Sequence, residues 1–217
     1  MIDLLFDNPA LFLQRLVLLI PAFLIAVTVH ELAHGLLADR LGDPTARLQG
    51  RLTLNPLPHI DPLGAVAFLL AGFGWAKPVP VNSYNLRHPT RDMVWIAAAG
   101  PLANFAAAFV GLVAAILAQR LVTLPFVAEP LIGMLAAVYR FNLVLAIFNL
   151  IPLPPLDGGH FLPYFLPRRS WNLVHRLEQY GPLLLLLLVM SGATGYLVGP
   201  VFGAVSGLFV TLARLLV

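Results

Sequence analysis

Long apolar runs separated by short polar segments form the dominant pattern of this chain. Five runs are long enough, or nearly long enough, to cross a bilayer as a helix, which takes roughly 17–25 residues. They cover residues 10–38, 93–118, 130–151, 181–198 and 201–217. The strands of a membrane β-barrel would alternate apolar and polar residues, whereas these runs are continuous. The pattern therefore predicts an all-α, polytopic membrane protein, a helical bundle of about five to six transmembrane segments.

A sixth apolar run, residues 62–75, is too short and too rich in glycine to span. Such a segment is tolerated at membrane depth only where protein covers it, so we expect it to be re-entrant or half-inserted. The stretch 77–86 that follows alternates in character and contains two prolines, which suits a β-like extended edge. No repeat or low-complexity linker divides the chain. We predict one domain over 1–217, with a core at 10–165 and a C-terminal helical hairpin at 180–217.

Composition supports a membrane protein. Hydrophobic residues make up 59% of the 217 residues and charged residues only 11%, and the mean hydropathy is +0.88. Ordinary soluble domains are about 25% charged, so we exclude a soluble core of this size. The absence of cysteine excludes disulfides and thiolate metal sites. The net charge of +3 is modest and favours a charge bias at the membrane, so we expect the lipid bilayer as a partner and no nucleic acid.

Basic residues distribute unevenly over the predicted topology. If the short run turns back and the other five cross, then loops 39–61, 76–92 and 152–180 share one face with the C-terminus, and Arg120 lies on the opposite face. The face that these three loops share with the C-terminus then holds most of the 13 Lys and Arg residues, namely Arg40, Arg47, Arg51, Lys77, Arg87, Arg91, Arg168, Arg169, Arg176 and Arg214. Cytoplasmic loops carry such an excess. We therefore predict a multi-pass protein of the cell membrane with its N-terminus outside and its C-terminus in the cytoplasm.

Glycines recur every fourth residue across the last two runs, at Gly195, Gly199, Gly203 and Gly207. Small residues at this spacing let helices approach closely. We favour packing within one subunit, and a homo-oligomer contact through the same row is the alternative. Pro200 is expected to start the final helix, because proline suits the first helical position.

The segment "HELAH" at 30–34 places ionisable groups at the end of an apolar helix. His30 and His34 are four residues apart, so they share one helix face and can reach the same ion. In the HExxH pattern Glu31 does not bind the metal but takes the proton of the metal-bound water. Ionisable residues at membrane depth are costly and usually functional. A structural salt bridge is the competing interpretation, but no basic residue lies close in sequence.

A catalytic zinc usually has three protein ligands, so a third must be His, Asp or Glu. Four further histidines lie in predicted loops, where we expect a solvated surface role: His59, His88, His160 and His175. The best candidate is Asp157 in "NLIPLPPLDGGH", because the glycines after it allow a tight turn that could aim its carboxylate inward. A surface Asp-Gly turn is the ordinary alternative. The topology favours Asp157, since run 130–151 ends on the same side as "HELAH".

With these residues considered, the chain resembles the site-2 protease family of intramembrane zinc metalloproteases, as a compact bacterial-type member without a PDZ domain. The resemblance covers roughly residues 20–165 and rests on four motifs: "HELAHG", "GWAKPVPVN", "GPLAN" and "NLIPLPPLDGG". It implies one zinc ion per chain held by His30, His34 and Asp157, with Glu31 as the general base. It further implies that Asn149 holds the scissile carbonyl or its oxyanion and that Asn104 is a polar support.

The resemblance implies that the chain hydrolyses peptide bonds in or near transmembrane segments of membrane proteins. A helical substrate must unwind first, because its carbonyls are in internal hydrogen bonds. We hypothesise that residues 77–86, with 62–75, offer an edge to which the unwound substrate adds as a strand, notably at Lys77, Pro78, Val79, Pro80 and Val81. A simple surface loop is the alternative. A metal or proton transporter and an inactive membrane scaffold of the same fold are the alternative functions.

Overall fold

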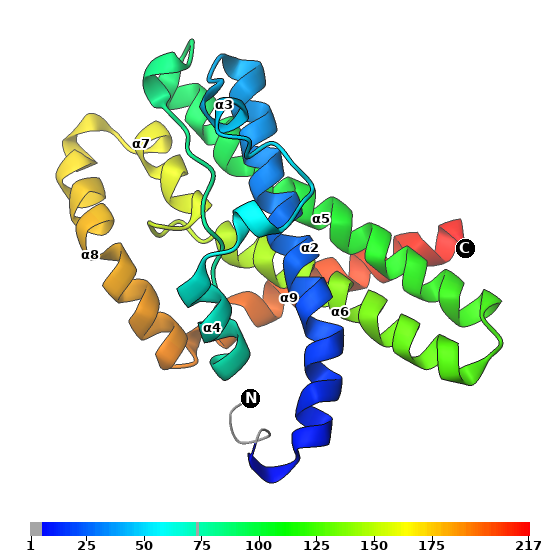
Figure 1. Cartoon of the computed structure of the whole chain (residues 1–217). Coiled ribbons are helices and arrows are strands. Elements are labelled where there is room, and N and C mark those ends of the chain that lie inside the picture. Colours follow the sequence, from blue (N-terminus) through cyan, green and yellow to red (C-terminus); the bar gives the residue numbers. More distant parts are fainter. Residues whose placement is uncertain (1–5, 73) are drawn as a thin grey trace.

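The computed structural model describes residues 6–72 and 74–217, so the first five residues and Phe73 of the predicted run 62–75 lie outside the described residues. Among the described residues, five helices are long and apolar enough to cross a membrane. They are α2 (Pro9–Leu41), α5 (Pro89–Leu121), α6 (Pro125–Asn149), α8 (Trp171–Met190) and α9 (Ala193–Leu216). The predicted all-α, polytopic fold is confirmed (Figure 1).

The boundary between the last two spans differs from the prediction. The break lies at Gly192, whose φ of 73° places it in the left-handed region that glycine adopts without strain. Pro200, expected to start the last helix, lies inside α9, so that prediction is wrong. Proline inside a membrane helix is tolerated because neighbouring groups satisfy the freed backbone carbonyl. The last two spans therefore extend over α8 and α9 instead of 181–198 and 201–217.

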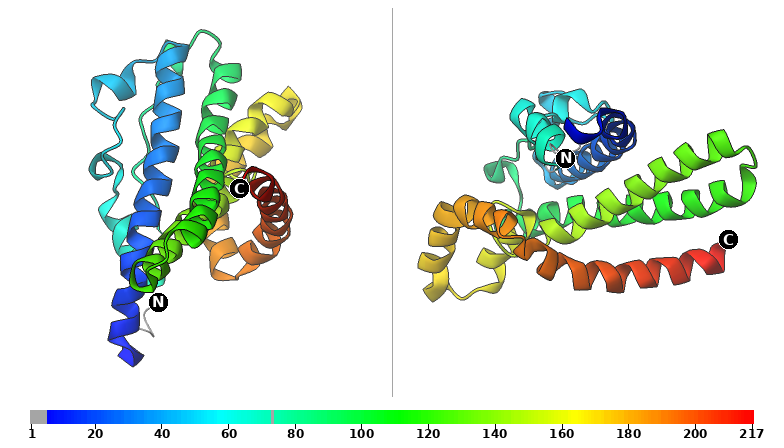
Figure 2. Two further views of the ribbon diagram at one scale, coloured as in Figure 1. Left: turned by 90° about the vertical axis from the view of Figure 1, so that its right-hand side faces the viewer. Right: turned by 90° about the horizontal axis from the view of Figure 1, so that it is seen from below.

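Helices α2, α5 and α6 form the centre of the bundle, and they pack against one another both from the side and from below (Figure 2). Their contacts use small residues. A Cβ added to Gly111 of α5 would lie 3.2 Å from the backbone nitrogen of Tyr139 in α6. Ala22 of α2 packs with Ala137 and Val138 of α6. Close backbone approach is the main source of helix association in lipid, where no hydrophobic force draws apolar helices together.

Helix α9 covers the α5–α6 pair with aromatic side chains instead of its glycine row. The rings of Phe202 and Tyr139 lie 6.4 Å apart, and those of Phe209 and Phe109 lie 5.2 Å apart. The Tyr139 hydroxyl also donates to Ser206 Oγ at 2.6 Å. A Cβ added to any glycine of the row would meet nothing within 4 Å: Gly195, Gly199, Gly203 and Gly207. The prediction that this row packs within one subunit is therefore wrong.

The short run 62–75 forms α4 (Pro62–Ala71), which begins at Asp61, whose carboxylate accepts a hydrogen bond from Gly64 N, and ends at Gly72. Ten residues of helix measure about 15 Å, half of a bilayer core, so α4 does not cross. Phe68 anchors it by stacking on Phe23 of α2 at 4.3 Å and meeting Phe141 of α6 at 5.8 Å. The expected short segment is confirmed, but its cover is one-sided: Phe68 is buried, whereas Leu63 and Val66 are exposed. Half-insertion stays a prediction.

The extended stretch after α4 pairs only weakly as a strand. Ile60 and Ala76 form an isolated antiparallel bridge, and no longer ladder involves the described residues. Beyond it the chain runs extended past α2 and makes a short 3₁₀ turn, η2 (Ser83–Asn85), before α5. We call residues 77–82 the strap.

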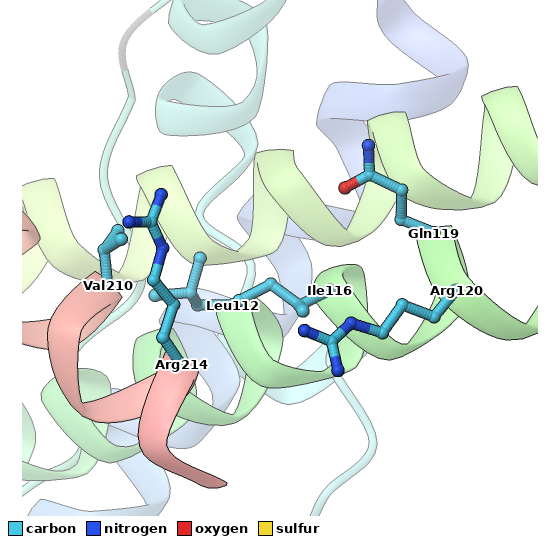
Figure 3. A pocket seen from close by; sticks show the side chains of 6 residues that line it. All are labelled: Leu112, Ile116, Gln119, Arg120, Val210 and Arg214. Carbon is cyan, nitrogen blue, oxygen red and sulfur yellow. The ribbon is translucent and has the colours of Figure 1, made fainter. Parts of the chain in front are cut away.

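The end of α9 lies beside the end of α5. A groove of roughly 430 Å³ between them is lined by Leu112, Ile116, Gln119, Arg120, Val210 and Arg214 (Figure 3). The Arg120 guanidinium donates to the backbone oxygen of Val217. Arg120 and Arg214 were predicted to lie on opposite faces of the membrane, but they line the same groove. Seen from below, α9 begins after the turn at Gly192 and runs alongside the α5–α6 pair, so that the C-terminus lies near the turn between α5 and α6 (Figure 2).

Candidate metal centre

Two histidines one helical turn apart project from α2 into the bundle. His30 is 6% and His34 is 7% exposed, and their Nε2 atoms lie 3.0 Å apart. Room for both rings comes from Gly100 of α5. A Cβ on Gly100 would lie 2.4 Å from His34 Nε2 and 2.7 Å from His30 Cε1. The "GP" step in the middle of α5 is therefore where that helix passes directly over the two imidazoles.

The far side of each imidazole is held by an oxygen. His34 Nδ1 lies 2.6 Å from the backbone oxygen of Ile96, which can only accept a hydrogen bond. His30 Nδ1 lies 2.6 Å from Asn104 Oδ1. The proton of each ring therefore sits on Nδ1, and the Nε2 lone pair of each is available to a metal.

Asp157 completes the cluster from the other half of the chain. It begins η3 (Asp157–Phe161), and its Oδ2 lies 3.0 Å from His30 Nε2 and 3.3 Å from His34 Nε2. The turn that delivers it needs glycine, because a Cβ on Gly158 would lie 2.4 Å from the backbone oxygen of Ile151. An ionised carboxylate only accepts hydrogen bonds, so Asp157 brings further lone pairs to the two imidazoles.

These three atoms lie within 4.8 Å of one another and could hold a metal ion. Each carries a lone pair toward the others, so Asp157 Oδ2 is buried without a hydrogen-bond donor in the part of the chain that the structure describes. Three converging acceptors repel one another unless a cation lies between them. A tetrahedral zinc with bonds of about 2.0 Å separates its ligands by about 3.3 Å, close to the observed spacing. The donor set of two imidazoles and one carboxylate suits zinc.

The Glu31 carboxylate contacts the strap. Glu31 is 7% exposed, and its Oε2 accepts a hydrogen bond of 2.7 Å from the backbone N–H of Val79. Because Pro78 and Pro80 carry no N–H, Val79 offers the single donor of this tripeptide. The strap thus lies against the "HELAH" turn of α2 and helps to set the position of the Glu31 carboxylate.

Neighbouring elements hold the strap at both ends. Lys77 N donates to the backbone oxygen of His59 at 2.9 Å, and Arg51 Nη2 donates to Lys77 O at 2.7 Å. At the other end Asn82 N donates to Asp43 Oδ2 at 2.6 Å. His59 is fully buried and its Nε2 bonds to Thr53 O at 3.0 Å, so the expected surface role is wrong for this histidine.

The remaining predicted residues are placed as follows. Asn104 lies against His30 and is fully buried. Asn149 is the last residue of α6, and its amide donates to Leu145 O at 3.1 Å. No hydrogen bond joins Asn149 to the described metal cluster. In the strap, Val79 and Val81 face the protein, where Val81 packs beside α2 and α5, whereas Lys77 and Pro78 are exposed.

Sequence reasoning missed three residues that shape the site. Gly100 leaves space for the imidazoles, Asp43 holds the strap, and Asn142 bonds to Asn104 at 2.8 Å. A polar residue inside a membrane helix is itself a signal, and Asn142 lies seven positions before Asn149 in an apolar run. Asp43 gave no such signal, because it follows Gly42 in what reads as an ordinary turn.

Comparison with known proteins shows the family of this chain. The model of "Peptidase family M50" matches residues 124–190, which include Asn149 and Asp157. YwhC of Bacillus subtilis, named as a zinc metalloprotease, is 38% identical over 188 residues, 86% of this chain and 86% of YwhC. This chain belongs to peptidase family M50.

More distant M50 relatives carry the same kind of name. Rip2 of Mycobacterium tuberculosis is 29% identical over 93% of this chain and 76% of its own length. Rip2 of Mycolicibacterium smegmatis is 30% identical over 86% of this chain and 71% of its own length. Both are named as zinc metalloproteases. No solved structure matches this M50 protein.

Proposed function

We propose that this M50 protein is an intramembrane zinc metalloprotease that hydrolyses peptide bonds in or near transmembrane segments of membrane proteins. The observation that carries the proposal is the convergence of His30 Nε2, His34 Nε2 and Asp157 Oδ2, three lone-pair atoms within 4.8 Å inside a membrane bundle. These residues would hold one zinc ion per chain. Such an ion, when bound, lowers the pKa of a coordinated water to about 7 and so supplies a nucleophile at neutral pH.

The chain's own residues would carry out the proton transfers and the positioning. Glu31 lies one residue from His30 on α2, and its carboxylate would accept the proton of the attacking water and pass it to the leaving amine. The Val79 N–H, bonded to one carboxylate oxygen, leaves the other oxygen for this task. Asn149 would bind the scissile carbonyl oxygen, since only one of its two amide N–H groups is needed for Leu145 O.

We propose that the strap positions the unwound substrate through its backbone. Residues Lys77, Pro78, Val79, Pro80 and Val81 run extended beside Glu31, which supports an added-strand interaction. Carbonyl oxygens dominate the groups that this edge offers, because two of the five residues are prolines and Val79 N–H bonds to Glu31. We expect Val81→Pro to lower cleavage of a membrane substrate while zinc content stays unchanged, and unchanged cleavage would refute the strand model.

The orientation in the membrane is also a proposal. The end of α2, the start of α5 and the start of α8 lie at the same end of the molecule (Figure 1). The segments there carry Arg40, Arg47, Arg51, Arg87, Arg91, Arg169 and Arg176. Because cytoplasmic loops carry an excess of basic residues, this end would face the cytoplasm. The start of α2 would then lie outside the cell membrane.

The experiment that tests the function compares wild type with Glu31→Gln in liposomes. Bound zinc and cleavage of a model transmembrane substrate are measured in the same samples. We expect one zinc in both proteins and cleavage only in wild type. Glu129→Gln, at the far end of α6, is the matched control and should cleave normally.

Two results would overturn the proposal. If neither protein bound zinc, the ligand assignment would be wrong. If zinc crossed the membrane and no peptide were cleaved, the transporter alternative would replace the protease.

A further inference from the structure

Three buried polar side chains from three helices form a continuous chain through the apolar centre of the bundle. They are His30 of α2, Asn104 of α5 and Asn142 of α6. Both asparagines are fully buried, and His30 is 6% exposed. Burying an amide in such surroundings is unfavourable unless its hydrogen bonds are made, so the partners of each amide determine how it is oriented.

The orientation of Asn142 follows from a backbone oxygen. Its Nδ2 donates to Val138 O at 2.8 Å, and a carbonyl oxygen can only accept. The amide nitrogen must therefore face Val138, and Oδ1 must face the other way. Oδ1 accepts a hydrogen bond of 2.8 Å from Asn104 Nδ2.

The orientation of Asn104 then follows from its own two acceptors. Its Nδ2 donates one hydrogen to Asn142 Oδ1 and the other to Ala26 O at 2.9 Å. With both amide hydrogens engaged, only Oδ1 can face His30 Nδ1, at 2.6 Å. The imidazole must supply the hydrogen of that bond, so its proton sits on Nδ1 and its Nε2 lone pair faces Asp157 and His34.

The two histidines differ in what sets their tautomer. His34 bonds to Ile96 O, a backbone group whose character no side-chain substitution changes. The tautomer of His30 depends on the side-chain amide of Asn104, which can rotate by half a turn.

Two acceptors hold the Asn104 amide, Asn142 Oδ1 and Ala26 O. Without the acceptor at position 142, the half-turn that presents NH₂ to His30 Nδ1 breaks one hydrogen bond instead of two. A ring that accepts at Nδ1 carries its proton on Nε2. A protonated Nε2 cannot bind a metal.

We propose that Asn142 is a positioning residue for the metal ligand His30, acting through Asn104. The inference rests on the proposed zinc site and adds to it a residue two hydrogen bonds removed from the metal. The competing interpretation is that Asn142 only joins α6 to α5. A packing role would depend on volume and polarity at position 142 and would be independent of Asn104.

Zinc affinity tests the proposal without relying on proteolysis. The purified full chain in detergent is titrated against a chelator of known zinc affinity, and helix content is followed by circular dichroism. Substitution of residues that orient metal ligands typically weakens metal binding 10–100-fold. We expect Asn142→Leu, which keeps similar volume but offers no acceptor, to weaken zinc binding about tenfold with helix content unchanged. Ile147→Val, a buried change in the same helix, should bind like wild type.

A double-mutant cycle separates the two interpretations. If Asn142 acts through Asn104, then Asn142→Leu adds little to the loss already caused by Asn104→Ala, and the two effects are strongly non-additive. Visible absorption of the Co²⁺-loaded protein gives a second readout. We expect the Asn142→Leu band to shift toward that of Asn104→Ala, because both alter the His30 ligand.

Asn142→Asp covers the case in which the leucine variant fails to fold. In these apolar surroundings the aspartate carboxyl stays protonated, so it can donate to Val138 O and keep its other oxygen toward Asn104. This variant should therefore bind zinc within a few-fold of wild type, and a loss as large as that of Asn104→Ala would overturn the proposal. Wild-type affinity in a folded Asn142→Leu, or additive losses in the cycle, would also overturn it. A wild-type chain that binds no zinc would instead overturn the proposed metal site itself, so the two failures are distinguishable.

Discussion

The backbone N–H of Val79 donates a 2.7 Å hydrogen bond to the carboxylate of Glu31, 48 positions earlier in the chain. The contact joins the strap, residues 77–82, to the residue proposed as general base. Proline on either side of Val79 restricts the local backbone, so the donor is presented in a narrow range of directions. The position of Glu31 therefore depends on how firmly the ends of the strap are held.

The first prediction concerns Asp43, which holds the strap from the end of α2. Asp43 is fully buried and accepts hydrogen bonds from Asn82 N at 2.6 Å and Asn85 Nδ2 at 2.8 Å. Asp43→Ala frees that end, and we expect cleavage to fall about tenfold while bound zinc stays at one per chain. Asp39→Ala, which removes a surface pair with Arg47, is the matched control and should cleave normally. Equal cleavage by both variants would show that the strap does not position Glu31.

The second prediction concerns the pH dependence of stability. Burial raises the pKa of Asp43, but hydrogen bonds from Thr45, Asn85 and Asn82 lower it, and the net value is below the ordinary 3.8. A carboxyl with a depressed folded pKa stabilises the folded state above its unfolded pKa, and this contribution is lost as the pH falls through the folded value.

The measurement compares free energies of unfolding in detergent for wild type and Asp43→Asn across a pH series. The advantage of wild type should be constant above about pH 5 and shrink below about pH 4. An advantage that stays constant through the acid range would contradict the lowered pKa of Asp43.

The third prediction concerns the space above the imidazoles. A Cβ on Gly100 would lie 2.4 Å from His34 Nε2, so Gly100→Ala must displace a proposed ligand. We expect zinc affinity, measured by chelator competition, to fall at least about tenfold. Gly133→Ala is the matched control, because its Cβ would lie 3.6 Å from Leu18 and make an ordinary contact. That variant should bind zinc normally and be more stable by about 0.5–1 kcal/mol, because alanine favours the helix.

The fourth prediction concerns the outward glycine row of α9, Gly195, Gly199, Gly203 and Gly207. An added Cβ meets nothing at these positions, so Gly199→Leu and Gly203→Leu should fold and bind zinc like wild type. A homo-oligomer through this row stays a prediction, and crosslinking in liposomes tests it. We expect the dimeric fraction of wild type to fall in both leucine variants. A dimeric fraction that does not change would place any oligomer contact elsewhere.

Local spacing in the sequence was sufficient to predict several features. His30 and His34 share a face because four residues make about one helical turn, and no tertiary contact is needed for that. The number of membrane spans followed from the length of apolar runs, since a bilayer requires about 20 apolar residues per helix. Gly158 and Gly159 after Asp157 predicted a tight turn, and the structure shows why a side chain there would collide with Ile151.

Tertiary structure decided the features that depend on contacts between distant segments. The direction of α9 was mispredicted because charge counting assumes that every span crosses in alternation, whereas Arg120 and Arg214 line one groove. His59 is buried only in the folded chain, where the strap bonds to its backbone through Lys77.

The hydrogen bonds around the proposed metal ligands also needed the folded chain. Asn142 reads as one polar residue in an apolar helix, and only the packing of α6 on α5 puts its amide within 2.8 Å of Asn104. The sequence by itself determined which side chains could bind zinc, because ligand type and helical spacing are local properties. The fold determined which lone pairs face inward, because the tautomer of each histidine depends on a partner from another helix.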